Sequence, residues 1–302
     1  MVPIDHPSRV SEARRAATAL AEAEGVADPG RAAIVASELA TNILKYATKG
    51  ALQISPLSNR GGAGVEILAM DRGPGIVNLT ESLRDGHSTA GTSGTGLGAV
   101  KRLSDEFDVY SQPGKTTVLM SRIRGNAASS VESQFVVGVT ERPVTGEEVS
   151  GDGWGIRSEN DRILMMVADG LGHGLLAADA SRAAVNAFRT SKEWEPIGLV
   201  EAMHRALRST RGAAVAVAVL EFGKKQVRFS GLGNIAGTVM MPGKSQGMVS
   251  LSGIAGHEAR QIREFVYPLS DESLVVMHSD GLSANWATKS SDLLRRHPGT
   301  IS

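Results

Sequence analysis

The chain has 302 residues, of which 41% are hydrophobic and 21% charged, and its formal net charge is zero. This composition fits about two globular domains, and the zero charge argues against non-specific nucleic-acid binding, which needs clustered lysine and arginine. The absence of cysteine excludes disulfides, thiolate zinc sites and cysteine nucleophiles. Because the sequence shows neither a signal-peptide core nor an apolar run of about 18 residues, we expect a cytoplasmic protein with no membrane or nucleic-acid partner.

The first half of the chain alternates helical and strand patterns. Apolar residues at helical spacing predict a helix over residues 9–24. A second helix is predicted within 28–50, with Asp28 as its N-cap, Pro29 in its first turn and Gly50 just after its end. A third helix should begin near Gly96. Strands are expected at about 51–57, 64–70, 107–111 and 116–122.

The second half has longer and more numerous strands. The small polar stretch 124–134 is the best linker candidate. Helices are expected at about 173–190 and 196–209. Strands are expected at 134–140, 154–158, 162–168, 213–221, 226–231, 235–240 and 273–278. The pattern predicts two α+β domains: residues 1–124, a linker over 125–133, and residues 134–302.

Polar side chains suited to a nucleotide occur on two predicted elements of the first half. Glu38 and Asn42 are four residues apart, so a helix would carry them on one face. Asp71 ends a predicted strand, where its carboxylate could accept the amino group of adenine. Asn42 offers an oxygen ligand for Mg²⁺, and Glu38 could orient or deprotonate an attacking group.

Two glycine-rich stretches follow Glu38 and Asn42 in the chain. Glycines beside Asp71 would let a flat base approach the backbone, and glycines before a helix expose N–H groups to phosphates. Each motif alone is a weak signal, because "DRGPG" is an ordinary turn and "GTGLG" an ordinary helix start. The order of all the parts together favours a nucleotide pocket. Its glycines are Gly73, Gly75, Gly94, Gly96 and Gly98.

These motifs resemble the GHKL-type ATPase domain, and within that group the RsbT-like anti-sigma-factor serine kinases. "SELATNILKYATKG" is similar to the N box, and "DRGPGI" and "GTGLGAVKRLSDEF" to the two glycine boxes. The resemblance implies that Glu38 is the catalytic base, Asn42 holds Mg²⁺ and Asp71 binds the adenine of ATP. It also implies nucleotide contacts from the five glycines and Thr117, and a lid over residues 77–93.

Three aspartates of the second half each follow or begin a predicted strand beside a glycine. They are Asp152 in "SGDGW", Asp169 in "MMVADGLGHG" and Asp280 in "VVMHSDGL". Carboxylates suit hard cations, and a pair of such ions can activate a bridging water. Asp-Gly is also the commonest tight-turn dipeptide, and we interpret His173 and His278 as structural residues rather than ligands.

Residues 134–302 resemble the SpoIIE-type, RsbX-like branch of the metal-dependent serine/threonine phosphatases. The matching stretches are "GDGW", "VADGLGHGLLAADAS", "FSGLGNIAGTVM" and "MHSDGL". The resemblance implies an αββα sandwich with two Mn²⁺ or Mg²⁺ ions. Asp152, Asp169 and the carbonyl of Gly170 would hold one ion, and Asp169 and Asp280 would contribute to the other.

The family pattern continues with a further strand that opens with an "RDDAT"-like turn, whose aspartate completes the second ion's site. No such turn follows Asp280 in this sequence, and Asp292 lies on an apparent helix. We therefore expect the second ion to lack one ligand, which leaves the phosphatase activity of this chain open.

The resemblances predict a GHKL (Bergerat) α/β sandwich followed by a PPM/SpoIIE-type αββα sandwich. The implied function is a bifunctional partner-switching regulator, which phosphorylates a STAS-domain antagonist and removes phosphate from phosphoserine or phosphothreonine. The oligomeric state stays open, with a homodimer as one option. Two other functions also stay open: an ATP-binding module that sequesters its partner, with the phosphatase as the only enzyme, and a scaffold with neither activity.

Overall fold

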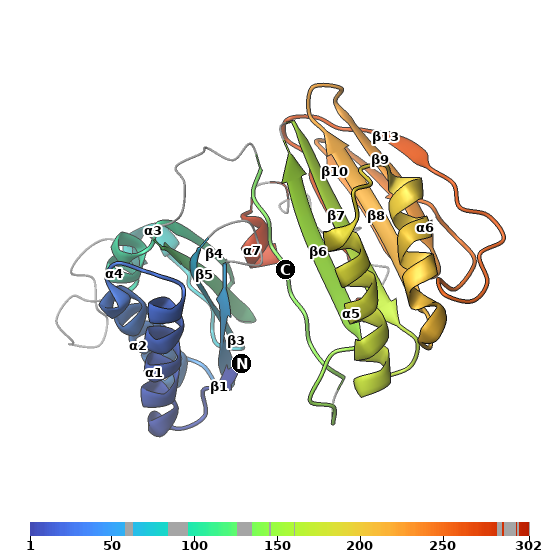
Figure 1. The fold of residues 1–302 in the computed structure, drawn as a ribbon. Helices are drawn as coiled ribbons and strands as arrows, with labels where there is room; N and C mark the ends of the chain where they lie inside the picture. The colour runs from blue at the N-terminus through green and yellow to red at the C-terminus, as the bar shows by residue number, and fades with distance from the viewer. Residues whose placement is uncertain are drawn as a thin grey trace. The chain divides into compact units, whose positions relative to one another are not determined.

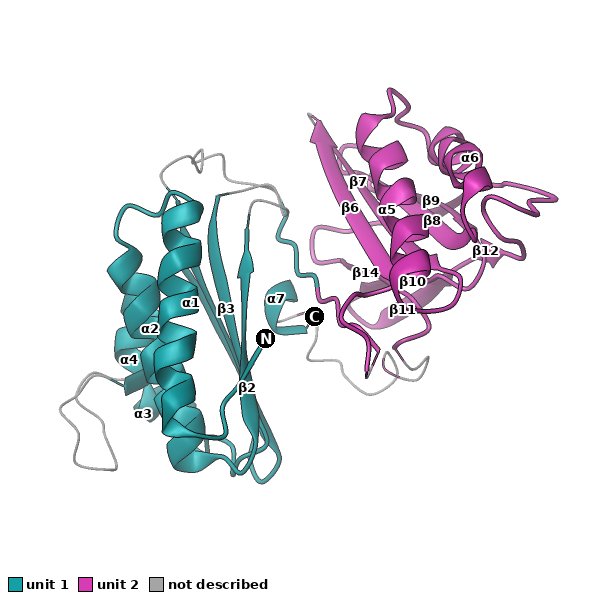
Figure 2. Ribbon diagram, turned by 60° about the horizontal axis from the view of Figure 1, so that its bottom comes forward, with its two compact units in different colours: residues 1–139, 296–302 teal, residues 140–295 magenta. Residues whose placement is uncertain are grey.

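The computed structural model divides the chain into two compact units, which Figure 2 shows in different colours. Unit 1 comprises residues 1–139 and 296–302, and unit 2 comprises residues 140–295. The described residues are 1–57, 63–83, 96–125, 135–144, 146–159, 161–282, 286, 294 and 296–301.

Unit 1 is an antiparallel sheet of five strands with its two long helices on one face. The strand order is β1-β2-β3-β5-β4, and Figure 1 shows α1 and α2 lying along the same side of it. The strands are β1 (Val2–Pro3), β2 (Gly50–Pro56), β3 (Gly64–Asp71), β4 (Glu106–Gln112) and β5 (Thr116–Arg124). The helices are α1 (Pro7–Ala23), α2 (Pro29–Tyr46), α3 (Leu79–Ser82), α4 (Gly96–Leu103) and α7 (Pro298–Ile301).

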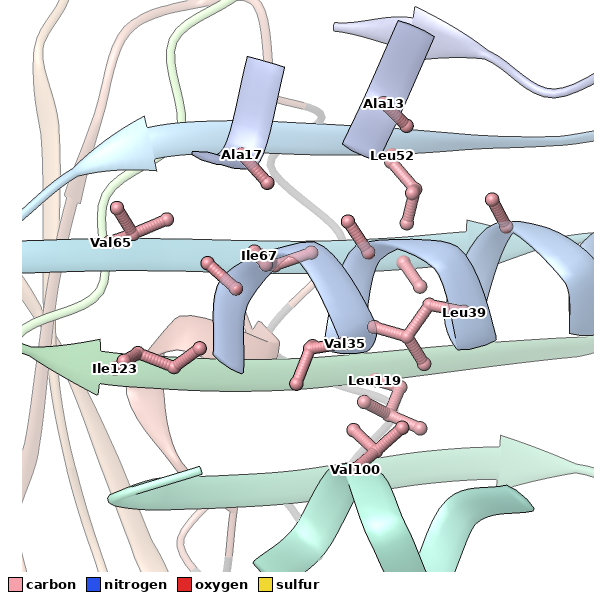
Figure 3. Close-up of a cluster of buried hydrophobic side chains, with 14 of the residues drawn as sticks. Ala13, Ala17, Val35, Leu39, Leu52, Val65, Ile67, Val100, Leu119 and Ile123 are labelled. Atoms are coloured by element: carbon pink, nitrogen blue, oxygen red, sulfur yellow. The ribbon is translucent and has the colours of Figure 1, made fainter. Parts of the chain in front are cut away.

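The core of unit 1 lies between α1, α2 and the sheet, as Figure 3 shows. The predicted start of α2 is confirmed, because the Asp28 side chain accepts a hydrogen bond from Gly30 N at 3.0 Å and Pro29 begins the helix. Val35 and Leu39 of this helix are buried against alternate residues of the strands, among them Ile67. Burying a side chain of this size stabilises the fold by about 1.5–3 kcal/mol.

A buried ion pair occupies the opposite face of the same sheet. Arg122 and Glu66, on β5 and β3, lie 2.8 Å apart and are almost fully buried. Two segments remote in sequence contact this pair. Arg122 Nη2 donates to the carbonyl of Val137, and His297, just before α7, lies 3.4 Å from Arg122 Nη1.

The strand predicted over residues 134–140 is wrong, since the described residues 135–140 form no strand. In the structure the Val137 carbonyl instead accepts from an arginine side chain. Gly138 lies so close to Pro298 that a Cβ at this position would be 2.1 Å from the Pro298 carbonyl oxygen. This segment therefore packs as irregular chain.

Unit 2 contains two sheets and two long helices. The six-stranded sheet has the order β12-β9-β8-β7-β6, with β13 also paired to β9, and the three-stranded sheet has the order β11-β10-β14. Helices α5 (Leu175–Thr190) and α6 (Pro196–Ala206) cover the larger sheet, and a 3₁₀ turn, η2 (Leu207–Ser209), follows α6. The strands are β6 (Asp152–Glu159), β7 (Arg162–Gly170), β8 (Ala213–Glu221), β9 (Gln226–Leu232), β10 (Ala236–Met241), β11 (Lys244–Met248), β12 (Ser250–Leu251), β13 (Phe265–Pro268) and β14 (Leu274–His278).

Glycines bring α5 unusually close to β6. A Cβ on Gly155 would lie 2.9 Å from Phe188 Cδ1, and one on Gly153 would lie 3.0 Å from Val185 Cγ2. Strands β7 and β8 form the centre of the sheet, where all nine residues of β8 are buried. The helical layer and the two sheets are three of the four layers of the predicted αββα sandwich. The second helical layer does not occur in the part of the chain that the structure describes. Within the same described ranges, no helix has both the length and the apolarity to cross a bilayer.

Candidate functional sites

Glu38 and Asn42 lie on the C-terminal half of α2, one turn apart and both half-buried. Neither side chain makes a hydrogen bond within the described ranges of the chain. Helical spacing places them on one face, and their polar atoms are therefore available to a ligand.

Asp71 ends β3, and its carboxylate is held by backbone groups. Oδ1 accepts from the N–H of Gly73 at 2.8 Å, and the Thr117 backbone donates to it as well. Burial raises the pKa of Asp71, although the two backbone hydrogen bonds lower it. A Cβ on Gly73 would lie 2.8 Å from Asp71 Oδ1, so only glycine leaves this carboxylate unobstructed.

Thr117 stands opposite Asp71 in the pairing of β3 with β5. Its hydroxyl lies 3.1 Å from Ser111 Oγ on β4, and Ser111 Oγ also accepts from Ile76 N at 2.7 Å. Gly75 has φ +68° and packs against the Gln112 carbonyl. Ser111 thus joins the Asp71 loop to the next strands, a role that the sequence analysis missed because an isolated serine in a strand carries no motif.

Gly96 begins α4, and Gly98 is buried in its first turn. A Cβ on Gly96 would meet no described atom within 4 Å, so none of the described residues packs against this position. Gly94 and residues 84–93 of the predicted lid lie outside the described residues. A backbone-held carboxylate, a Glu and an Asn without hydrogen bonds to the described residues, and a glycine at the start of a helix together fit a magnesium nucleotide, because they supply an acceptor, oxygen ligands and N–H donors.

In unit 2, Asp152 begins β6 and Asp169 lies near the end of β7, and the two residues are register partners. Gly170 follows Asp169 and packs directly on α5, where a Cβ would lie 2.0 Å from the Ala177 carbonyl oxygen. Only glycine fits at this position, and the close packing fixes the carbonyl and the loop after Asp169.

Asp280 reaches the same region from the end of β14. Asn234, in the turn between β9 and β10, donates to Asp280 Oδ2 at 3.1 Å and also to Asp169. Ser279 Oγ donates to Asp152 Oδ2 at 2.9 Å. The sequence analysis missed Asn234 and Ser279 as site residues, although both lie within the quoted family stretches.

The three aspartates influence one another electrostatically. Burial, then the charges of Asp152 and Asp280, raise the pKa of Asp169 to about 6. Burial and the charge of Asp280 also raise the pKa of Asp152. Within the described residues, no three acidic or histidine side chains enclose a single ion. The donor set nevertheless fits hard divalent cations, because mutually repelling carboxylates gain most from a nearby positive charge.

Both histidines near this site have protein partners. His173 Nδ1 lies 2.6 Å from Glu147 Oε1. His278 accepts from Trp286 Nε1 at 3.0 Å, and its other ring nitrogen lies 2.7 Å from the Ser279 carbonyl oxygen. These contacts agree with a structural role for both rings. Asp292, the substitute ligand considered from the sequence, lies outside the described residues.

Comparison with known proteins finds two separate matches along the chain. Residues 5–122 match the family model of the histidine kinase-like ATPase domain, and residues 159–294 match that of stage II sporulation protein E (SpoIIE). The serine/threonine-protein kinase RsbT of Bacillus subtilis (strain 168) is 43% identical over 97 residues, which are 32% of this chain and 73% of RsbT.

The phosphoserine phosphatase RsbX of the same organism is 24% identical over 139 residues, which are 46% of this chain and 70% of RsbX. A solved structure described as the bacterial stressosome, a modular system adapted to control secondary messenger signalling, is 24% identical with a TM-score of 0.51. It covers 55% of this chain and 88% of its own. This structural likeness concerns the fold.

Proposed function

Because the chain belongs to the family of RsbT-type serine/threonine kinases and carries a SpoIIE-type domain after its ATPase domain, we propose that it is a bifunctional partner-switching enzyme. Its first domain phosphorylates a serine or threonine of a partner protein, and its second domain hydrolyses such a phosphate. The observation that carries the proposal is that one chain holds a backbone-held Asp71, a Glu38 and an Asn42 that make no hydrogen bond within the described residues, and a cluster of three aspartates of which two sense the charge of the third.

In the kinase domain, Asp71 receives the amino group of adenine and Asn42 provides an oxygen to Mg²⁺. Gly73, Gly75, Gly96, Gly98 and Gly94 line the nucleotide, with Thr117 behind the base. Glu38 accepts the proton of the attacking hydroxyl, because it shares a face with Asn42 and has no other side-chain partner within the described ranges.

In the phosphatase domain, Asp152, Asp169 and the Gly170 carbonyl would hold one Mn²⁺ or Mg²⁺, and Asp169 and Asp280 would contribute to a second site. Such ions supply a water of lowered pKa and neutralise charge on the phosphoryl group. Asn234 and Ser279 orient the aspartates through hydrogen bonds to Asp280, Asp169 and Asp152.

The partner proposed for both domains is a STAS-domain antagonist. The names of the relatives support a protein substrate, and so does the surface beside Asp169. Three leucines of the loop and of the start of α5 are exposed, with Leu171 at 39%, Leu175 at 68% and Leu176 at 51%. Exposed large apolar side chains beside a charged site favour docking of a folded partner over capture of a small polar molecule.

The proposal is tested by incubating the chain with ATP, Mg²⁺ and a STAS-domain protein, and by measuring the mass of that protein. The phosphorylated product is then isolated and returned to the chain with Mn²⁺. Glu38→Ala should abolish the first reaction and spare the second, whereas Asp169→Asn should do the opposite. Loss of both reactions in either variant would indicate misfolding or a shared site.

A binding module is the second candidate, in which unit 1 sequesters its partner and ATP is only a structural ligand. Glu38 is half-buried and makes no hydrogen bond within the described residues, which favours a catalytic role over sequestration alone. The two are separated by the partner's mass: a stable ATP-dependent complex without any phosphorylated partner would establish sequestration.

A further inference from the structure

Arg211 lies beside the loop that follows Asp169. A Cβ on Gly172 would be 3.3 Å from Arg211 Nη1, so the guanidinium rests against the backbone of this loop. Gly172 also has φ +90°, a conformation that favours glycine. Both its conformation and its lack of a side chain therefore admit the arginine.

The backbone around Arg211 is rigidly tied. Gly212 has φ +81°, and its carbonyl accepts from Leu171 N at 3.0 Å. Gly212 N donates to Thr210 Oγ1 at 3.0 Å, and Thr210 Oγ1 donates to the Leu207 carbonyl at 2.7 Å. The next residue along, Ala213, is the register partner of Gly170. Arg211 therefore lies two residues before Ala213, which pairs with Gly170, and the Gly170 carbonyl is a proposed metal ligand.

The charge of Arg211 is not neutralised by the described part of the protein. Arg211 is exposed, and no described carboxylate forms an ion pair or hydrogen bond with it. By contrast, Arg205 at the end of α6 lies 3.9 Å from Glu201. A guanidinium that lies against the loop after Asp169, without an ion-pair partner among the described residues, suits an anion bound beside that loop, with its oxygens toward the arginine.

We infer that Arg211 binds the phosphate group of the phosphatase substrate. The ligand class is a phosphomonoester, here the phosphoserine of a partner protein, and two guanidinium N–H groups would donate to two phosphate oxygens. Arg211 acts in binding and orientation, and no bond forms or breaks at it. This inference rests on the proposed phosphatase function and deepens it.

The kinetic test compares Arg211→Gln, Arg211→Lys and the control Arg208→Gln in the full chain with Mn²⁺. Arg208 is an equally exposed arginine on η2. Arg211→Gln should raise KM for a phosphoserine peptide and the inhibition constant of inorganic phosphate by about 10- to 100-fold, with kcat changed less than about threefold. Arg211→Lys should recover part of the loss, and Arg208→Gln should match the parent.

A small aryl phosphate distinguishes phosphate binding from protein docking. Equal increases in KM for the aryl phosphate and the peptide support the inference. An increase in KM for the peptide alone would mean that Arg211 contacts the partner's acidic side chains, and this would overturn the inference. Parent-like constants for Arg211→Gln would also overturn it.

Equilibrium binding separates this inference from the phosphatase proposal. The phosphoserine peptide and its unphosphorylated twin are titrated into parent and variants with Mn²⁺. In one outcome, the parent binds the phosphorylated peptide more tightly, Arg211→Gln loses this preference, and the parent hydrolyses nothing. This outcome would support the binding role of Arg211 and overturn the phosphatase function. If the parent hydrolyses the peptide and Arg211→Gln still binds it in a phosphate-dependent way, the phosphatase function is supported and the role of Arg211 is overturned.

Discussion

Asp152 and Asp169 face each other across β6 and β7 as direct register partners. Two carboxylates are thus fixed side by side by strand pairing, and Asp280 adds a third charge that both of them sense. Such an arrangement is electrostatically unfavourable without a cation. The metal-free protein should therefore be less stable than the same fold with one carboxylate removed.

Asp169→Asn should change stability in opposite directions with and without metal. Because the folded pKa of Asp169, about 6, lies above the reference of 3.8, its contribution to stability is present below pH 3.8 and is lost as pH rises through about 6. At pH 8 without metal the variant should be more stable by on the order of 1 kcal/mol, allowing for solvent screening. Calorimetric unfolding measures this.

With Mn²⁺, the order should reverse, because the parent gains binding energy that the variant lacks. Parent and variant are compared with Asp271→Asn, a change at a fully exposed aspartate of unit 2. Phosphatase activity should collapse only in Asp169→Asn, and ATP binding should be retained in both. Equal stabilisation of all three proteins by Mn²⁺ would place the ion elsewhere.

Metal titration should reveal two unequal affinities. An ion at Asp152 and Asp169 would have the Gly170 carbonyl as a further ligand, and Ser279 orients Asp152 through a hydrogen bond, whereas among the described residues only Asp169 and Asp280 are proposed as ligands of the second ion. We expect calorimetry with Mn²⁺ to show one tighter and one weaker site. Two equally tight ions would mean that another residue completes the second site.

Asp71→Asn should weaken ATP binding. The carboxylate accepts from Gly73 and Thr117 backbone groups and is the expected acceptor for adenine, so an amide would present a donor where an acceptor is needed. The cost should be about 1–3 kcal/mol, which isothermal titration can measure. Asp5→Asn, at an exposed aspartate of the same unit, is the control; equal affinity of the two variants would remove Asp71 from the nucleotide site.

Glu38→Ala should retain ATP affinity within a few-fold and abolish transfer to the partner, because Glu38 acts on the nucleophile and not on the bound nucleotide. Its side chain makes no described hydrogen bond, so α2 should be undisturbed. ATP titration and the partner's mass are measured on the same preparations. Glu22→Ala, an exposed change on α1, should behave as the parent; transfer at the parent rate by Glu38→Ala contradicts the role.

Glu106 should stabilise unit 1 in a defined pH range. The hydrogen bond from His297, with the charges of Arg122 and Arg124, lowers the pKa of Glu106 from 4.5 to about 2. A depressed pKa contributes stability above pH 4.5 that is lost as pH falls toward 2. Glu106→Gln should lower stability at pH 7 by about 1–3 kcal/mol, and its difference from the parent should shrink as pH falls from 4.5 toward 2. Glu22→Gln should show no such difference.

Much of the fold could be predicted because its patterns are local. The predicted helix over 9–24 corresponds to α1, and the capped start at Asp28 and Pro29 to that of α2. By contrast, β11 carries mostly polar, exposed residues in a hairpin across Gly243. Alternation was therefore absent there, and only its pairing with β10 makes it a strand.

The site residues show the same division. Asp71, Asp152, Asp169 and Asp280 were predicted because glycines and strand ends mark them in sequence. Ser111, Asn234 and Arg211 were not, since each is an ordinary polar residue, and the groups that contact them, at Ile76, Asp280 and Gly172, come from other parts of the chain. Their importance comes only from the folded arrangement.

The return of residues 296–301 to unit 1 has a consequence for dissecting the protein. Arg296 donates to the Val109 carbonyl at 2.8 Å, and His297 N donates to Asp108 Oδ2 at 3.0 Å, so unit 1 is built from two stretches of chain. A protease site inserted within 126–134 would cut the polypeptide without releasing a complete kinase unit. The two fragments should co-elute in gel filtration, because the hydrogen bonds of residues 296–301 to unit 1 hold them together without a covalent link. Strong dilution or His297→Ala should weaken this association.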